Sequence, residues 1–114
     1  MRVKTGFTRR RAHKKTLTAN KGYRMSKHRL YKVAREAELH AGQYAYAGRR
    51  LRKRDFRRLW IIRLKAALNA EGVKYSQFIH DLKLAKIELD RKILAEIALN
   101  HPGVFKAIVD TVKH

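Results

Sequence analysis

The chain has 114 residues, no cysteine, one proline and a formal net charge of +20. This length allows one domain with at most an extension, the lack of cysteine excludes disulfides and thiolate metal sites, and no apolar run of 18 residues could span a membrane. The charge is uneven, since residues 1–65 hold 22 Lys and Arg against three acids, whereas residues 66–114 hold seven against six. No apolar segment follows the basic N-terminus, so we expect no secretory signal and a cytoplasmic setting.

The scarcity of proline and of strand-like alternation predicts an all-α fold: a long basic N-terminal helical extension plus a small C-terminal helical bundle. The first helix is predicted over residues 8–20, with Thr8 as its N-cap and Gly22 near its end. Three arginines at 9–11 would lie in its first turn, where the positive end of the helix dipole opposes them. We therefore expect this helix to be weak without an anion.

A second, much longer helix is predicted over residues 26–71, because the segment lacks proline and Gly72 supplies an end. Its length would be about 70 Å at 1.5 Å per residue. Gly42 and Gly48 are the positions at which we expect a bend or an irregular turn. The remainder of the chain is too small to cover such a helix, so its first part must lie on another molecule.

Four apolar stripes at helical spacing predict the bundle. The end of the long helix supplies the first stripe, and three shorter helices follow. Ser76 and Asp90 are expected to cap the first two, and Pro102 in the first turn opens the third. The residues expected to be buried are Trp60, Ile61, Leu64, Ala67 and Leu68; Phe78, Ile79, Leu82 and Ala85; Ile93, Leu94, Ile97 and Ala98; and Val104, Phe105, Ile108, Val109 and Val112. We expect a basic extension at 1–58 and a small α-helical globular domain at 59–114.

The densest charge lies between Arg49 and Arg58, where seven of ten residues are cationic and Asp55 is the one acid. On a helix, residues 50, 54 and 58 share one face and residues 49, 53 and 57 the next, so cations surround the axis. Each like-charge pair four residues apart opposes the helix by roughly 0.2–0.5 kcal/mol. Arginine grips phosphate with two parallel hydrogen bonds and stacks on bases. This pattern indicates a polyanion that approaches from several sides.

A solvated helix face is the ordinary explanation of a charge run, but it would mix both signs. Residues 1–35 instead hold 13 cations and no acid, which favours polyanion binding. Aromatic residues lie among these cations, and stacking on unpaired bases would favour RNA. The alternative is packing, which we favour for Phe56 and Trp60; for Tyr23, Tyr31, Tyr44 and Tyr46 both roles stay open.

Six histidines suggest a metal site, but none forms a metal-binding motif and no cysteine completes one. His80 and Asp81, or His101, could suggest a catalytic pair, yet no nucleophile or Gly-rich phosphate loop accompanies them. We therefore expect no enzymatic activity, no metal and no cofactor.

Several segments resemble one known family, the bacterial large-subunit ribosomal protein L-twenty (L20). They are residues 42–46 (GQYAY), 49–61 (RRLRKRDFRRLWI), 75–79 (YSQFI) and 90–95 (DRKILA), together with Arg2 to Gly6, 13–15 (HKK) and 19–23 (ANKGY). The similarity runs nearly end to end. The departures are local: Arg24-Met25 stands where glycine is common, Ala47-Gly48 where a charged pair is usual, and His80-Asp81 replaces Asn-Gly.

The resemblance implies a structural constituent of the large ribosomal subunit that binds large-subunit (23S-type) ribosomal RNA and acts early in subunit assembly. Its implied partners are this RNA and neighbouring large-subunit proteins, and members of the family can also repress translation of their own message. The candidate RNA-binding residues are Arg2, Lys4, Arg9, Arg10, Arg11, His13, Lys14, Lys15, Lys21, Tyr23, Arg24, Lys27, Arg29, Tyr31, Lys32, Arg35, Tyr44, Tyr46, Arg49, Arg50, Arg52, Lys53, Arg54, Arg57 and Arg58.

Two alternatives make different predictions. A DNA-binding or DNA-compacting basic protein would form a dimer with a short recognition helix. A membrane-active cationic helix would need a wide apolar face, which residues 24–58 lack.

Overall fold

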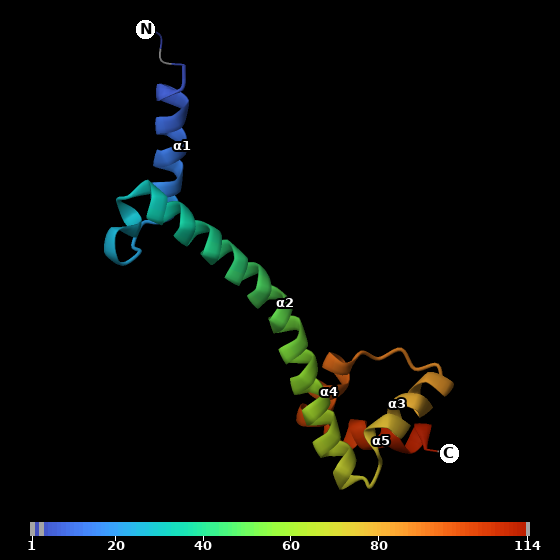
Figure 1. Cartoon of the computed structure of the whole chain (residues 1–114). Coiled ribbons are helices and arrows are strands. Elements are labelled where there is room, and N and C mark those ends of the chain that lie inside the picture. The colour runs from blue at the N-terminus through green and yellow to red at the C-terminus, as the bar shows by residue number, and fades with distance from the viewer. Residues whose placement is uncertain (1, 3, 114) are drawn as a thin grey trace. The chain divides into compact units, whose positions relative to one another are not determined.

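The computed structural model describes residue 2 and residues 4–113. Over these residues it contains five α-helices, one 3-10 helix and no strand (Figure 1). In chain order the elements are α1 (Gly6–Ala19), the 3-10 helix η1 (Met25–His28), α2 (Tyr31–Ala70), α3 (Tyr75–Leu84), α4 (Arg91–Asn100) and α5 (Pro102–Val112). The predicted all-α fold, with one long helix followed by small C-terminal helices, is confirmed.

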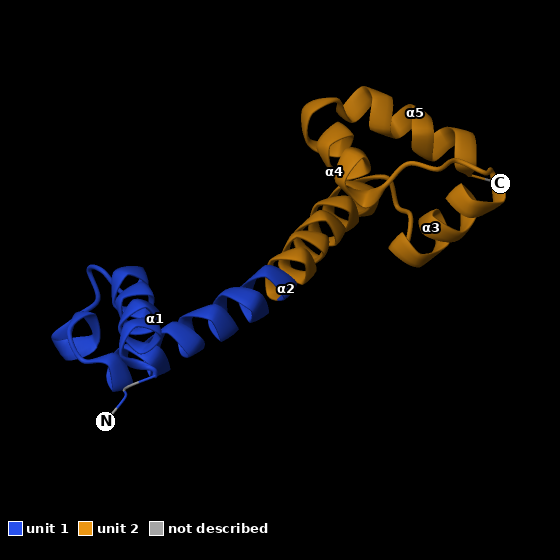
Figure 2. Ribbon diagram, turned by 90° about the horizontal axis from the view of Figure 1, so that it is seen from above, with its two compact units in different colours: residues 1–50 blue, residues 51–114 orange. Residues whose placement is uncertain are grey.

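The chain divides into two compact units, residues 1–50 and residues 51–114 (Figure 2). Helix α2 belongs to both, since it contributes residues 31–50 to unit 1 and residues 51–70 to unit 2. The division expected at residue 58 follows from charge and apolar pattern, and it stays a prediction.

Helix α1 begins two residues earlier than predicted. Thr5 is its N-cap residue and makes no side-chain capping bond, while the Thr8 hydroxyl lies inside the helix and donates to the Thr5 carbonyl at 3.2 Å. The prediction of Thr8 as N-cap is therefore wrong. Because the first turn starts at Gly6, Arg10 and Arg11 fall in the second turn, farther from the positive helix end than expected. The helix ends at Ala19, ahead of Gly22, whose φ is +85°.

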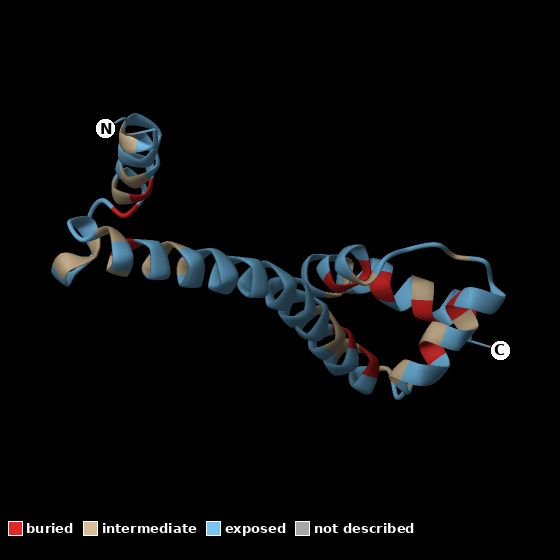
Figure 3. Cartoon of the chain, turned by 45° about the horizontal axis from the view of Figure 1, so that its top comes forward, coloured by how far each residue is buried: buried red, intermediate tan, exposed pale blue. Residues whose placement is uncertain are grey.

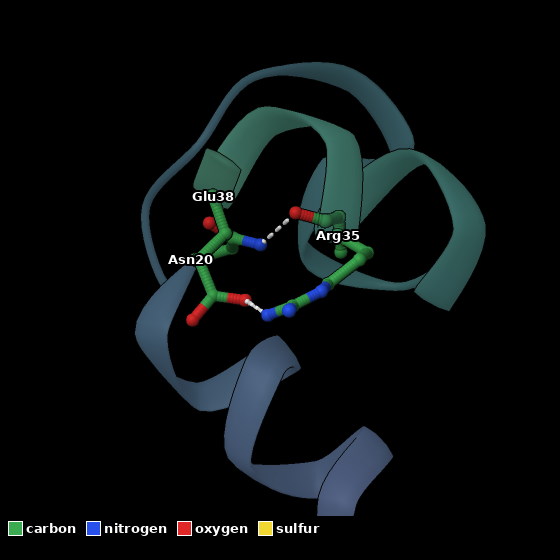
Figure 4. Close-up of polar contacts among 4 residues, drawn as sticks. Asn20, Arg35 and Glu38 are labelled. Carbon is green, nitrogen blue, oxygen red and sulfur yellow. Dashed lines mark hydrogen bonds and ion pairs between the residues drawn. The ribbon is translucent and has the colours of Figure 1, made fainter. Parts of the chain in front are cut away.

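A small buried contact joins α1 to the start of α2 within unit 1. Thr16, Asn20 and Ala34 are buried, and the Asn20 side-chain amide donates to the Ala34 carbonyl at 2.6 Å (Figure 4). The His13 and Tyr31 rings stack 3.6 Å apart. This bond satisfies the buried amide N–H of Asn20 and joins the two helices, while the buried Asn20 Oδ1 has no hydrogen-bond partner among the described residues.

The long helix begins later than predicted, at residue 31 and not at residue 26. Residues 25–28 form η1 instead, and α2 begins at Tyr31. Residues 29 and 30 lie outside both helices, and Arg29, with a φ of −117°, ends η1 before α2 begins. At Gly42 and Gly48, where an irregular turn was expected, the backbone remains α-helical.

Helices α2 and α3 end in the same motif, in which a left-handed residue allows two backbone bonds back into the last turn. In α2 this residue is Gly72 (φ +69°), and the Val73 N–H donates to the Leu68 carbonyl at 3.0 Å. In α3 it is Lys86 (φ +54°), and the Ile87 N–H donates to the Leu82 carbonyl at 3.0 Å. Gly72 is the end predicted for the long helix, whereas Lys86 holds a conformation that favours glycine.

Unit 2 has one hydrophobic core, to which the end of α2 and the helices α3, α4 and α5 all contribute (Figure 3). The Phe78 and Phe105 rings meet at its centre, 5.8 Å apart, and Trp60 packs partly buried against it. The buried residues are Leu64, Leu68, Phe78, Leu82, Leu94, Ala95, Phe105, Val109 and Val112. The predicted small helical bundle is present.

Two predicted helix starts in this bundle are confirmed and one is wrong. The Asp90 carboxylate accepts the Ile93 N–H at 2.8 Å, and Pro102 is the first residue of α5. By contrast, α3 begins at Tyr75 with Lys74 as its N-cap, so Ser76 caps nothing.

Three residues expected in the core lie on the surface, since Ala85, Ile93 and Val104 are exposed. Ala85 follows the last residue of α3. In α4, Ala95 is buried in place of Ile93, while Leu94, Ile97 and Ala98 face the core as predicted. In α5 the buried residues are Phe105, Val109 and Val112, which leaves Val104 outside their stripe.

Candidate nucleic-acid interface

The middle of α2 is exposed on every side. Each residue from 42 to 59 is exposed, and this stretch includes the seven cations between Arg49 and Arg58 (Figure 3). Because successive helical residues are rotated by about 100°, seven cations in ten residues surround the axis. Among the residues that the structure describes, none of these seven takes part in a salt bridge. Apart from Asp55, which is exposed in the same segment, every charged residue here is a cation, and the charge of these cations faces solvent with no ion pair to another described residue.

Most of the other candidate RNA-binding residues are also exposed. Every candidate before residue 51 belongs to unit 1. His13, Lys27 and Tyr31 are half-buried. His13 and Tyr31 are already engaged with each other through their stacked rings. Arg35 forms a salt bridge with Glu38 at 3.0 Å (Figure 4).

Some arginines rest on aromatic rings before any ligand is bound. The Arg50 guanidinium lies 5.2 Å from the centre of the Tyr46 ring and donates to the Tyr46 hydroxyl at 3.2 Å. The Arg11 guanidinium lies 4.4 Å from the Phe7 ring. Such cation–π contacts orient an arginine and leave its remaining N–H groups free to donate.

The structure distinguishes exposed aromatic side chains from those that pack in the core. Tyr23, Tyr44 and Tyr46 are exposed to 37%, 69% and 56%, so their faces can be reached by a ligand. Trp60 packs against the core of unit 2, as expected. The expectation of a core position for Phe56 is wrong, because this side chain is 49% exposed. It lies one turn before Trp60 on the same face of α2 and stacks on the Trp60 ring at 6.1 Å, but it is not part of the core.

Sequence reasoning missed two cations that the fold brings to the arginine-rich segment. Arg91 and Lys92, at the start of α4, line one groove of about 440 Å³ together with Lys53, Arg54, Arg57, Trp60 and Asp90. The Arg91 guanidinium is held in place by the Tyr75 hydroxyl, which accepts from its Nε at 2.9 Å. One feature of the sequence could have pointed to them: residues 91 and 92 are the one pair of adjacent Lys and Arg residues in the nearly neutral segment 66–114.

Neither metal-binding nor membrane-spanning features are found over the described range. In residue 2 and residues 4–113, no three His, Cys, Asp or Glu side chains are grouped to hold a metal ion. No helix in this range is both long and apolar enough to cross a bilayer. His114, one of the six histidines, lies outside the described residues.

These features define a class: a strongly basic, all-helical protein with a solvent-exposed arginine-rich helix that enters a small apolar bundle. Comparison with known families agrees with this class. The family described as Ribosomal protein L20 matches residues 2–108, and the chain therefore belongs to the L20 family. The predicted family membership is confirmed.

Similar proteins cover the chain nearly completely. "Large ribosomal subunit protein bL20" of Desulfovibrio desulfuricans is 55% identical over 113 residues, which is 99% of this chain and 96% of that protein. The proteins of the same name from Erythrobacter litoralis and Methylibium petroleiphilum are 50% and 52% identical over 112 residues, which is 98% of this chain and 94% and 95% of theirs. The chain is a structural constituent of the large ribosomal subunit, and the predicted location on the ribosome is confirmed.

Proposed function

We propose that the chain binds large-subunit ribosomal RNA directly and thereby supports an early step of large-subunit assembly. One observation carries the proposal: the seven exposed cations from Arg49 to Arg58 surround a helix and have no acidic partner among the described residues. These seven, with Arg91 and Lys92, form what we call the basic surface.

Phosphate groups are the partner that this surface fits. Arginine donates two parallel hydrogen bonds to one phosphate, and each neutralised phosphate releases condensed counterions, which drives binding. Because the cations point in all directions, several RNA segments can contact α2 at once. Contacts of this kind position a protein by backbone geometry, with little reading of base edges.

The same geometry supports an early role in assembly. A helix contacted from several sides has to be in place before the RNA segments close around it, because a fold that is already closed leaves no path for a charged rod. The apolar core of unit 2 needs no RNA to bury its side chains, and it would keep the C-terminal half folded at this stage.

The extension at 1–58 is then stable as helix chiefly on RNA. Its like charges oppose one another, and unit 1 offers three buried residues, Thr16, Asn20 and Ala34, to offset that repulsion. Circular dichroism of a peptide of residues 1–60 should show helix gained on addition of large-subunit RNA. A peptide that is already fully helical alone would contradict this account.

The deciding experiment is competition between structured RNA and duplex DNA. The full chain is titrated with large-subunit RNA over a salt series, in the presence of duplex DNA of equal phosphate concentration. We expect the RNA to be retained in excess DNA and the logarithm of the binding constant to fall steeply with the logarithm of salt. Equal affinity for both would overturn the ribosomal RNA proposal and favour a general DNA-binding or DNA-compacting protein.

Repression of the chain's own message would use the same surface, since a messenger RNA that folds like the ribosomal site offers the same phosphates. Fusion of the message leader to a reporter tests this, and expression should fall when the chain is supplied in excess.

A further inference from the structure

Unit 1 contains a groove that the basic surface does not include. It has a volume of about 490 Å³ and lies between the segment after α1 and the first turns of α2, with both walls in unit 1. Tyr23, Lys27, Glu36, His40 and Tyr44 line it, along with small aliphatic side chains of α2. This volume is in the range of small-ligand sites in proteins.

Its lining suits a flat aromatic ligand. Tyr44 is 69% exposed and Tyr23 is 37% exposed, so a base can reach both side chains. The His40 ring lies 6.0 Å from the Tyr44 ring at an interplanar angle of 25°, which extends the stacking surface. Stacking of an unpaired base on an aromatic ring strengthens binding by about 5–150-fold.

The carboxylate of Glu36 selects among the bases. It is 73% exposed and faces His40 Nε2 at 3.9 Å, so its oxygens keep free lone pairs. A carboxylate only accepts hydrogen bonds, and it repels phosphate. Guanine alone among the four RNA bases presents two adjacent donors on its pairing edge, N1–H and the 2-amino group. Adenine and cytosine present one donor beside an acceptor, and uracil presents one donor between two acceptors.

We infer that this groove binds an unpaired guanine of the RNA, with the base stacked on Tyr44 and its N1–H and 2-amino groups donating to Glu36. Lys27, half-buried in the same groove, contacts the accompanying phosphate. The inference rests on the proposed RNA binding and adds a base preference that phosphate contacts cannot supply.

The first test changes the RNA and leaves the chain intact. Five hairpin RNAs differ in one bulged nucleotide, which is guanosine, inosine, adenosine, cytidine or uridine, and the full chain binds each at a salt concentration that weakens non-specific contacts. Guanosine should bind at least about tenfold more tightly than adenosine, cytidine and uridine. Inosine keeps N1–H but lacks the 2-amino group, so it should fall between. Equal affinity for all five overturns the inference while leaving RNA binding standing.

The second test changes the chain. Glu36→Gln removes a negative charge, so it should raise affinity slightly for the adenosine, cytidine and uridine hairpins. It should lower affinity for the guanosine hairpin and so abolish the preference for guanosine. Glu38→Gln is the matched control: it removes the same charge next to the groove, but this carboxylate is paired with Arg35 and does not line the groove, so the preference should stay. Tyr44→Leu should weaken the bulged hairpins and spare an unbulged one.

The two proposals fail in different ways. A preference that survives Glu36→Gln overturns the guanine site alone. Failure of every hairpin to bind overturns the proposed function and the guanine site with it. Far-UV circular dichroism of each variant, free and bound to an unbulged hairpin, checks that its helix content matches that of the unchanged chain.

Discussion

The all-round placement of cations on α2 makes a sharp prediction about salt dependence. One triple variant replaces the cations of one helix face by glutamine, and a second replaces those of the neighbouring face: Arg50, Arg54 and Arg58, and Arg49, Lys53 and Arg57. All six side chains are exposed. If RNA contacts both faces, both variants lose binding to a similar degree.

The expected size follows from the number of charges. Each neutralised phosphate contributes about 0.7–0.9 to the slope of log K against log salt, so three lost contacts lower the slope by about 2–3. If both proteins bind equally at 1 M salt, this is a loss of about 100–1000-fold at 0.1 M, or roughly 3–4 kcal/mol. Glutamine favours helix about as well as arginine, and each triple removes two repulsive pairs, so α2 itself is not weakened.

The assay is filter binding or fluorescence anisotropy with large-subunit RNA over a salt series. The control replaces three exposed lysines of unit 2 outside the basic surface, Lys74, Lys83 and Lys106, by glutamine. It matches the loss of net charge and should change the slope little. A large loss in one face variant and none in the other would refute the reasoning, because it would mean that RNA contacts one side of α2 only.

Three further predictions concern the helices. Lys86→Gly should stabilise unit 2 by about 1 kcal/mol, because glycine adopts the left-handed backbone at φ +54° without strain. Gly72→Ala should destabilise unit 2 by a similar amount, because alanine is strained at φ +69°. Urea denaturation followed by Trp60 fluorescence measures both, and equal unfolding midpoints would contradict the argument. Asp90→Ala should cost about 1 kcal/mol through loss of the 2.8 Å capping bond, and Asp90→Asn, which keeps a capping oxygen, should cost little in the same assay. Gly48→Ala should raise helix content in circular dichroism, because glycine costs up to about 1 kcal/mol in a helix and an added Cβ would meet no atom within 4 Å; unchanged ellipticity would show that α2 is already fully formed there.

The helices of unit 2 were predictable because their signals are local. Apolar periodicity located each one, and Asp90 and Pro102 marked two starts correctly. Thr8 and Ser76 were the wrong choices because a capping side chain contributes only about 1 kcal/mol, and the chain begins α1 and α3 at residues that lack such a bond. The interruption at residues 29 and 30, between η1 and α2, could not be predicted, because neither residue is a glycine or a proline.

The candidate site was predictable where it consists of one helix. Exposure of the residues between Arg49 and Arg58 followed from charge alone, since so many like charges cannot be buried. The position of Arg91 beside Arg54, and of Tyr23 beside Tyr44, depends on how separate segments pack. The members of each pair are far apart in the sequence, so no local sequence pattern predicts that they line the same groove.

The exposure of α2 also bears on the lifetime of the free protein. Residues 42–52 are exposed throughout and contain three arginines, each a cleavage site for trypsin-like proteases. Backbone helical bonds and the exposed Arg50–Tyr46 contact resist opening at these sites, and such opening costs far less than unfolding a packed core. We therefore expect trypsin to cleave the free chain in this segment faster than the RNA-bound chain.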